Sequence, residues 1–309
     1  MATKHELARL VEFSLPWLRD SPELQPANLA RLVDSEAYAH RKPFPHVVID
    51  LEAGLFPREL LHNVLAELPE STTKDGCANS TSLFEASRAT TGVVIPTSGG
   101  SVGKSTSGKF KCFAKPGQQV RKSQITSEKL MGVATRALFG VLRSPRFVNW
   151  LEAMSGLHNL IADPSFYGSG VHLVGKGGYL EVHSDFNFLL GSNRTRKHRR
   201  LNAFVYLNPH WCDEFGGHLE LWDRNMTGCV KRLLPKFGRF VAFSSTDYSY
   251  HGHPTPLTPP EGRMRRSVAM YYYTKGSRPV DECYRGDCTR YHTTTWQRGH
   301  GVCAALPDP

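Results

Sequence analysis

The chain has 309 residues, of which 40% are hydrophobic and 21% charged, and its formal net charge is +10. This is the composition of an ordinary globular protein, and it excludes a disordered tail, a collagen-like rod and a coiled coil. No apolar run approaches the roughly 18 residues of a membrane span, and residues 1–18 lack the apolar core of a signal peptide. We therefore expect a soluble, cytoplasmic protein.

The first half of the chain is predicted to be mainly helical. Residues 43–50 (PFPHVVID) form one short buried strand, and residues 56–68 have apolar residues at helical intervals. Residues 69–125 are rich in Ser, Thr, Gly and Lys and are predicted to be a loop-rich insertion. Within it, residues 91–106 resemble a phosphate-binding loop, but Ser98 stands where that motif requires glycine. We expect a plain loop there.

Two further helices are expected between residues 126 and 164. Ser144 and Pro145 suit the start of the second helix, and Gly156 suits its end. From about residue 170 the apolar period changes to alternation, and short strands at close spacing predict a sandwich or barrel. The five strand-like runs are VHLVGKGGYLEVHSDFN, RLNAFVYLN, GGHLELWD, FGRFVAFSS and RRSVAMYYYT.

The predicted fold class is mainly β with flanking helices, in a single domain over residues 1–309. Residues 1–164 supply the helical support, with the strand at 43–50 and the insertion at 69–125. Residues 165–275 form the β core, and residues 276–309 are a C-terminal extension.

Neither the cysteines nor the charge run identifies a function. The seven cysteines are scattered without a C-x-x-C pair, which predicts free thiols in a reducing compartment rather than a disulfide framework or zinc ribbon. Residues 194–200 (RTRKHRR) contain five lysines or arginines and are expected in a loop after the strand that ends at HSD. Such a run fits a solvated face, a nucleic-acid contact, a nuclear address, or a patch that attracts an anionic substrate.

One predicted strand ends with a metal-binding pattern. Side chains at positions i and i+2 of a strand point to the same face, so His183 and Asp185 can reach one metal ion. A second histidine has to come from another strand, where His251 and His253 are the candidates. Two histidines and a carboxylate form the ligand set of non-haem Fe(II) oxygenases, which leaves positions open for a cosubstrate and dioxygen.

A downstream arginine complements this pattern. Alternation places Arg265 and Ser267 of RMRRSVAMYYYT on one face of a strand. An arginine inside a barrel needs an anion, because an unpaired buried charge is very costly. The far carboxylate of 2-oxoglutarate meets this need through a bidentate pair, while its 2-oxo acid end chelates iron.

The order of these motifs resembles that of the 2-oxoglutarate/Fe(II)-dependent oxygenases, most closely their prolyl 4-hydroxylase-like branch. The order is H-x-D, Y-L-N-x-x-W, G-G-x-L-x-L, a distal histidine and R-x-S, over about residues 165–275. PFPHVVID resembles the first strand of such enzymes. The resemblance implies a double-stranded β-helix core (a jelly roll, cupin-like). It also implies an oxidoreductase that uses Fe(II), 2-oxoglutarate and O2, with ascorbate as a support, to oxidise a C–H bond by hydroxylation, desaturation or oxidative cyclisation.

Carried over position by position, the resemblance makes His183, Asp185 and His251 the metal ligands and the catalytic centre. His251 is preferred to His253 because the family ligand lies in the H-G that follows the F-S-[ST] strand. Arg265 matches the anchor of 2-oxoglutarate.

Four more residues are expected in the cosubstrate part of the cavity. Tyr206 matches a phenol that binds the same carboxylate, and Leu219 matches an apolar residue packed against the cosubstrate. Asn202 shares a strand face with Tyr206, and Ser267 shares one with Arg265.

The motifs leave the substrate open. A small anionic or amino-acid-like metabolite is favoured, because no separate peptide- or RNA-binding module is visible. The alternatives are a prolyl-type protein hydroxylase and a non-catalytic cupin-like barrel that only holds metal, which would not need Arg265. We expect neither a membrane nor nucleic acid as a partner. Asn187 is expected either to face substrate or to stabilise its turn, and the insertion 69–125 and the tail 276–309 are candidate lids.

Overall fold

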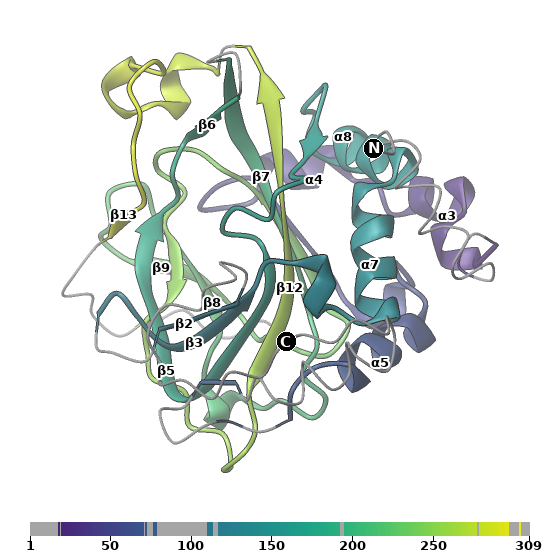
Figure 1. Cartoon of the computed structure of the whole chain (residues 1–309). Helices are drawn as coiled ribbons and strands as arrows, with labels where there is room; N and C mark the ends of the chain where they lie inside the picture. The colour runs from purple at the N-terminus through teal and green to yellow at the C-terminus, as the bar shows by residue number, and fades with distance from the viewer. Residues whose placement is uncertain are drawn as a thin grey trace.

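The computed structural model describes residues 18, 20–70, 72, 77–78, 110–113, 117–191, 195–276, 278–296 and 303. Antiparallel strands curl into a barrel, and helices cover one side of it (Figure 1). The expected loop at residues 91–106 lies outside the described residues. Among the described helices, none is long and apolar enough to cross a membrane.

The barrel consists of two layers that share one long, bent strand, β5 (Gly170–Ser184). The first layer has the order β10-β7-β12-β5 and the second has the order β5-β11-β8-β9. This antiparallel order is that of a double-stranded β-helix, so the predicted fold class is confirmed. The other strands of the two layers are β7 (Arg196–Tyr206), β8 (Leu219–Trp222), β9 (Cys229–Leu233), β10 (Phe240–Ser244), β11 (His251–His253) and β12 (Arg265–Lys275).

β5 can take part in both layers because glycines let it bend in its middle. Its first half pairs with β12 and its second half pairs with β11. Gly177 lies at the bend with a φ of 75°, and a Cβ on Gly178 would come within 2.5 Å of Val174 Cγ1. A side chain at either position would therefore disturb the turn from one layer to the other.

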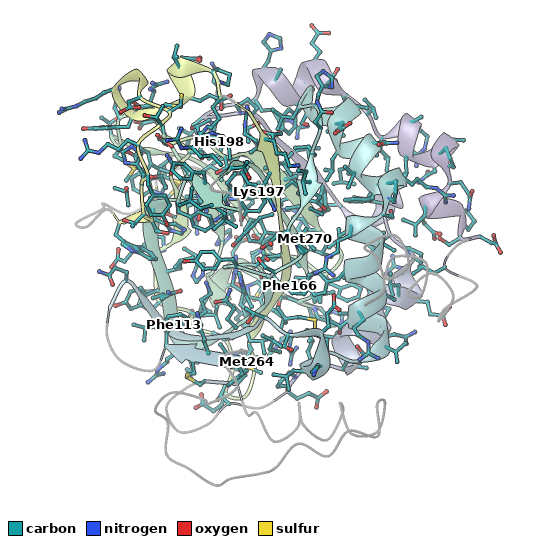
Figure 2. All side chains as sticks on the ribbon, turned by 45° about the horizontal axis from the view of Figure 1, so that its top comes forward. Phe113, Phe166, Lys197, His198, Met264 and Met270 are labelled. Atoms are coloured by element: carbon teal, nitrogen blue, oxygen red, sulfur yellow. A yellow bond between two sulfur atoms is a disulfide. The ribbon has the colours of Figure 1, made fainter. Side chains whose placement is uncertain are left out.

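Strand alternation separates the helix-facing core from the barrel interior. On β12, Val268, Met270 and Tyr272 belong to the main hydrophobic core, while Ser267 and Tyr271 line a pocket inside the barrel. Side chains such as Met270 fill the space between the sheet and the helices (Figure 2). The more polar face of β12 therefore lines the inside of the barrel and does not face bulk solvent.

The helices form a layer on this core. They are α3 (Pro26–Arg31), α4 (Ser35–His40), α5 (Arg58–Ala66), α7 (Val133–Arg143) and α8 (Pro145–Ser155), with short 3-10 turns at Pro22–Leu24, Leu51–Ala53, Glu128–Leu130, Asp213–Phe215, Val280–Glu282 and Tyr284–Gly286. α8 begins and ends as predicted, because the Ser144 side chain accepts a hydrogen bond from the Phe147 amide and Gly156 is left-handed, with a φ of 68°. The predicted early strand is β1 (His46–Ile49), which pairs with β10.

The prediction of a loop over residues 69–125 is wrong for the end of that range. β2 (Phe110–Phe113) pairs with β3 (Gln119–Ile125), and β3 pairs with β5, so both extend the sheet. The strand was missed because Gln119, Lys122 and Gln124 face the internal pocket, which removes the apolar alternation that marks a strand. Residues 79–109 of the insertion lie outside the described part.

The basic run is also not the loop that was expected. From Arg196 onward it is the start of β7, and His198, Arg199 and Arg200 are buried. Arg199 forms an ion pair with Asp185, and Arg200 forms one with Glu282. Of the described part of the run, only Thr195 and Arg196 are exposed to solvent.

The remaining short strands lie at the edges of the barrel. β4 (Ile161–Ala162) pairs with β12, β6 (Phe188–Leu190) pairs with β7, and β13 (Thr295–Trp296) pairs with β5. β13 belongs to the C-terminal extension and brings that segment to the open end of the pocket.

The prediction of free thiols is wrong for most of the cysteines. Disulfides join Cys77 to Cys112, Cys229 to Cys303 and Cys283 to Cys288, and Cys212 is free. The paired cysteines are separated by 35, 74 and 5 positions in the sequence, so no short cysteine motif indicated the pairing. A cytoplasmic location stays a prediction, without the support of reduced cysteines.

We expect thiol titration of the denatured protein, purified without reductant, to find one free thiol, from Cys212. Prior reduction should raise the number to that of all cysteines in the sequence. Alkylation and peptide mass mapping then identify the modified residue. Full alkylation of all cysteines without reduction would contradict the pairing.

Candidate active site

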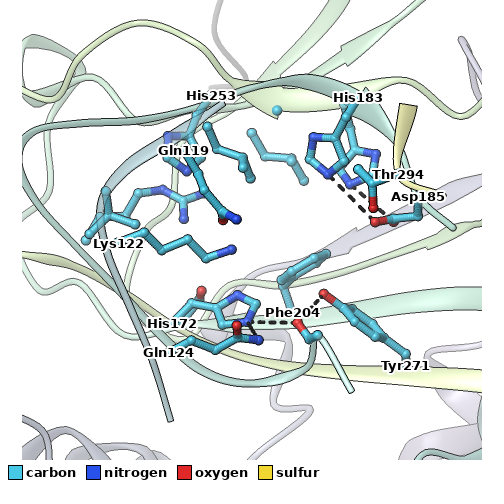
Figure 3. Close-up of a pocket in the computed structure, with 18 of the residues that line it drawn as sticks. Gln119, Lys122, Gln124, His172, His183, Asp185, Phe204, His253, Tyr271 and Thr294 are labelled. Atoms are coloured by element: carbon cyan, nitrogen blue, oxygen red, sulfur yellow. Dashed lines mark hydrogen bonds and ion pairs between the residues drawn. The ribbon is translucent and has the colours of Figure 1, made fainter. Parts of the chain in front are cut away.

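Two strands bring the three predicted metal ligands together. His183 and Asp185 lie at the end of β5, and His251 opens β11, where it pairs directly with His183. The side chains are buried, and one ligand atom from each lies within 4.8 Å of the others. Asp185 carboxylate oxygens lie 3.7 Å from His183 Nε2 and 3.5 Å from His251 Nε2. Figure 3 shows His183 and Asp185 at one end of the pocket.

The backbone orients both imidazole rings toward the cluster. His183 Nδ1 lies 2.8 Å from the Glu181 carbonyl oxygen, and His251 Nδ1 lies 2.9 Å from that of Ser249. Because a carbonyl can only accept, each Nδ1 carries the proton and each Nε2 presents its lone pair to the cluster. Burial lowers the pKa of His183 to about 3 and also lowers the pKa of His251. Both rings are thus neutral, as metal ligands must be.

Asp185 is held as a carboxylate by two neighbours on β7. Asn202 Nδ2 donates to Asp185 Oδ2 at 2.7 Å, and an Arg199 nitrogen lies 2.9 Å from the same oxygen. Burial alone would raise the pKa of Asp185, but Arg199 and the two histidines outweigh it and lower that pKa. Two neutral imidazoles and a carboxylate are a donor set that fits Fe(II).

Arg265 supplies a buried positive charge to the same pocket. Its Nε donates to the Gly217 carbonyl at 2.7 Å, and its guanidinium lies over the Tyr206 ring, 5.0 Å from the centroid. Its Nη2 is 3.4 Å from the Tyr206 hydroxyl, and no acidic side chain of the described residues acts on it. A Cβ on Gly217 would lie 2.9 Å from Arg265 Cδ, so the motif glycine makes room for the arginine.

The pocket joins the cluster to Arg265. Its volume is about 160 Å³, below the roughly 300–1,000 Å³ usual for small-molecule sites. Of the residues predicted beside Arg265, Tyr206, Leu219 and Ser267 line the pocket. Asn202 does not, because its side chain lies behind Asp185 and bonds to it. Only a small ligand, or a small part of one, fits inside.

His253, the histidine not preferred as a ligand, also lines this pocket. It is buried, and its Nδ1 has no hydrogen-bond partner within the described structure. Burial and the nearby Arg265 and Lys122 lower its pKa, so it is neutral.

Other lining residues were not predicted from the sequence. Lys122 and Gln124 come from β3, which was read as loop, and His172 comes from the helix-distal face of β5. Arg199 was not predicted because it lies in a run of charged residues, and such runs are usually exposed to solvent. Its guanidinium lies 3.4 Å from the centroid of the Tyr271 ring, and this cation–π contact stabilises the buried charge.

The C-terminal extension completes the wall. β13 places Trp296 opposite His183, with the ring centroids 4.8 Å apart, and Thr294 also lines the pocket. Asn187 holds this segment, because its side chain donates to the Arg290 carbonyl and accepts from the His292 amide, both at 2.9 Å. Asn187 therefore stabilises the tail rather than facing substrate.

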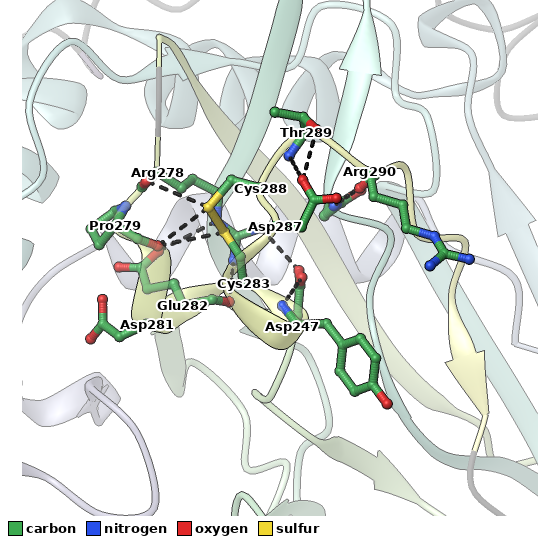
Figure 4. The surroundings of a disulfide bond; sticks show 12 residues. Asp247, Arg278, Pro279, Asp281, Glu282, Cys283, Asp287, Cys288, Thr289 and Arg290 are labelled. Atoms are coloured by element: carbon green, nitrogen blue, oxygen red, sulfur yellow. Dashed lines mark hydrogen bonds and ion pairs between the residues drawn. A yellow bond between two sulfur atoms is a disulfide. The ribbon is translucent and has the colours of Figure 1, made fainter.

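The base of the tail is fixed to the barrel by buried polar contacts (Figure 4). Arg278 pairs with Asp247 at 3.1 Å, and the Tyr284 amide donates to the same carboxylate at 2.8 Å. The disulfide between Cys283 and Cys288 closes the turn between these contacts and the strand that reaches the pocket.

Comparison with known proteins agrees with this geometry. A sequence model of the 2OG-Fe(II) oxygenase superfamily matches residues 169–273. That stretch includes the histidine and aspartate cluster as well as Arg265. No curated protein matches the sequence.

The chain is similar to several solved structures at low identity. One is a prolyl hydroxylase from Trichoplax adhaerens in complex with a hypoxia-inducible factor peptide, at 18% identity and a TM-score of 0.47, covering 80% of this chain and 90% of that one. A prolyl-4-hydroxylase from Pseudomonas putida has 15% identity and a TM-score of 0.45, covering 80% and 100%. HygX from Streptomyces hygroscopicus, with nickel, 2-oxoglutarate and hygromycin B, has 14% identity and a TM-score of 0.40, covering 74% and 82%.

The barrel topology and the family match together define a 2-oxoglutarate-dependent dioxygenase. Residues 169–273, which contain most of the barrel, match the 2OG-Fe(II) oxygenase superfamily. The predicted superfamily, enzyme class and cofactors, Fe(II) and 2-oxoglutarate, are thereby confirmed.

The orientation of Asp185 by Asn202 is testable without turnover. We expect Asn202→Ala to weaken Fe(II) binding by about 10- to 100-fold, the usual effect of removing a group that orients a ligand. Calorimetric titration under nitrogen measures the affinity, with a thermal melt to verify folding. Asn225→Ala, in the exposed turn between β8 and β9, is the control and should bind as the wild type does. Equal affinity in a folded Asn202→Ala protein would contradict this role.

Proposed function

We propose that this dioxygenase oxidises a C–H bond of a small anionic or amino-acid-like metabolite, with His183, Asp185 and His251 as its iron ligands. The observation that carries the site assignment is that one pocket contains both this cluster and Arg265, a buried cation without an acidic partner in the described structure. A barrel that only stored metal would have no use for such an arginine.

Each side chain has a distinct task in this proposal. Iron, when bound, supplies the activation of dioxygen that C–H oxidation requires. The Nε2 atoms of His183 and His251 and the Asp185 carboxylate would hold the ion at the wall of the pocket. Asn202 and Arg199 keep the carboxylate in place from behind.

Arg265 binds the far carboxylate of 2-oxoglutarate through charge-assisted hydrogen bonds, with the Tyr206 hydroxyl beside it. Ser267 and Leu219 line the same part of the pocket. A dicarboxylate fixed at Arg265 has its other end directed into a pocket that also contains the iron ligands. Holding both ends in one geometry is the protein's main contribution to the rate.

A small substrate is supported by the limited space in the pocket. Its volume of about 160 Å³ has to hold the cosubstrate as well as the reacting part of the substrate, and Trp296 and Thr294 of the C-terminal extension form part of its wall. The basic run supports an anionic substrate less than its sequence suggests, since Arg199 and Arg200 are already paired with Asp185 and Glu282.

A prolyl-type protein hydroxylase is the alternative, suggested by the motif order. The Trichoplax protein is described with a peptide and HygX with hygromycin B, so both kinds of ligand occur among similar structures. Proline-containing peptides therefore belong in the same assay as amino acids and their conjugates.

Purified protein with Fe(II), ascorbate and 2-oxoglutarate should form succinate, and do so faster with its substrate. We expect Asp185→Ala to abolish succinate formation. Arg265→Ala should raise the KM for 2-oxoglutarate by about tenfold to a hundredfold, because it removes hydrogen bonds to a charged group. Mass spectrometry of candidate substrates should show the gain of one oxygen or the loss of two hydrogens.

Arg266→Ala is the matched control for Arg265→Ala. The side chain of Arg266 bonds to the Pro69 carbonyl and does not line the pocket, so its removal should leave the KM for 2-oxoglutarate unchanged. Unaltered succinate formation in Asp185→Ala or Arg265→Ala would refute the site. Turnover of peptides but of no small molecule would favour the alternative.

A further inference from the structure

A third cation projects into the pocket with no partner of its own. The Lys122 side chain is 8% exposed and extends into the middle of the pocket, between Gln119 and His253 on one side and His172 and Gln124 on the other (Figure 3). No hydrogen bond or ion pair satisfies its ammonium group within the described residues. Burial lowers its pKa to about 8, with Asp185 as the carboxylate that opposes this effect.

A distortion of β3 aims this lysine inward. Arg121 has a φ of 50°, in the left-handed region that non-glycine residues rarely adopt, and the pairing of β3 with β5 shifts there. Regular alternation would point Gln119 and Lys122 to opposite faces, but both line the pocket. The Arg121 guanidinium donates to the Lys176 carbonyl on β5 at 2.6 Å, which holds the bulge. Bulges of this kind re-aim side chains beside active sites.

The other two cations of the pocket are already accounted for. Arg199 lies 2.9 Å from Asp185 and is enclosed by aromatic rings. Arg265 lies beside Tyr206 and is the anchor for the cosubstrate in the proposed function. Lys122 is the cation that remains, and its unpaired buried charge is costly until an anionic ligand pairs with it.

We propose that Lys122 binds a carboxylate of the substrate, with the side-chain amide of Gln119 as a second donor. This assignment rests on the proposed function and narrows its substrate class to small carboxylic acids. Gln119 is available because its side chain makes no hydrogen bond in the described structure, whereas the amide nitrogen of Gln124 already contacts Ser169 and His172. Leu180, Phe204 and Trp296 also line the pocket and suit the apolar part of such an acid.

Binding without turnover tests this directly. Wild type, Lys122→Met and Lys111→Met are loaded with Fe(II) and saturating 2-oxoglutarate under nitrogen, then titrated with benzoate and N-acetylglycine and with their neutral amides. Met keeps the length of the lysine stem and removes only its charge. Lys111, exposed on the neighbouring strand β2, is the matched control for loss of one positive charge.

We expect wild type and Lys111→Met to bind at least one carboxylate better than its amide, and Lys122→Met to bind it about tenfold or more weakly. The affinity of Lys122→Met for 2-oxoglutarate should equal that of the wild type. Its melting temperature without ligands should be no lower, because the substitution removes an unpaired buried charge.

Three results would overturn the assignment. One is equal binding of carboxylates and amides by the wild type, and another is equal carboxylate binding by Lys122→Met and Lys111→Met. The third is a lower affinity of Lys122→Met for 2-oxoglutarate, which would assign Lys122 to the cosubstrate instead. Failure of the proposed function is separate, since it appears as no succinate formation by the wild type in air.

Discussion

Among the described residues, one carboxylate and three cations line the pocket inside this barrel, and their pairing governs the rest of the site. Asp185 lies between Arg199 and the two histidines, so it stays ionised and fixed in direction. Arg265 and Lys122 have no carboxylate of their own in the described structure. In a low-dielectric interior such unpaired charges are costly, and an anionic ligand that pairs with them lowers this cost. The apoprotein therefore carries an excess of positive charge that favours binding of anions.

Strand geometry explains why these charges can share so small a space. The register of β5 with β11 sets His183 opposite His251, and the two-residue period of β5 puts Asp185 on the same side. β7 contributes Asn202 and Arg199 from behind, and β12 contributes Arg265 from the neighbouring edge. None of the described helices supplies a residue to the pocket, because the helices pack on the opposite face of the sheet.

The sequence was sufficient to predict the parts of this arrangement that depend on local spacing. His183 and Asp185 follow from strand alternation, and α8 follows from Ser144 and Gly156. The sequence was insufficient for inward-facing polar residues that lie outside the recognised motifs. Lys122 and Arg199 are charged residues among charged or polar neighbours, a pattern that solvated segments share. Only the fold reveals that these positions face a pocket, because their partners lie on strands distant in the sequence.

The residues proposed for the reaction and those proposed for substrate specificity come from different parts of the chain. The family match spans residues 169–273, which include the proposed iron ligands and the proposed anchor of 2-oxoglutarate. Lys122 precedes that stretch on β3, and Trp296 follows it on β13, yet both line the same pocket. Residues shared by a superfamily serve the reaction that its members share, whereas the residues around them determine which substrate is bound. The bulge at Arg121 directs Lys122 into the pocket, and Asn187 holds the tail that carries Trp296. In these two ways the chain adds residues from outside the matched stretch to the pocket.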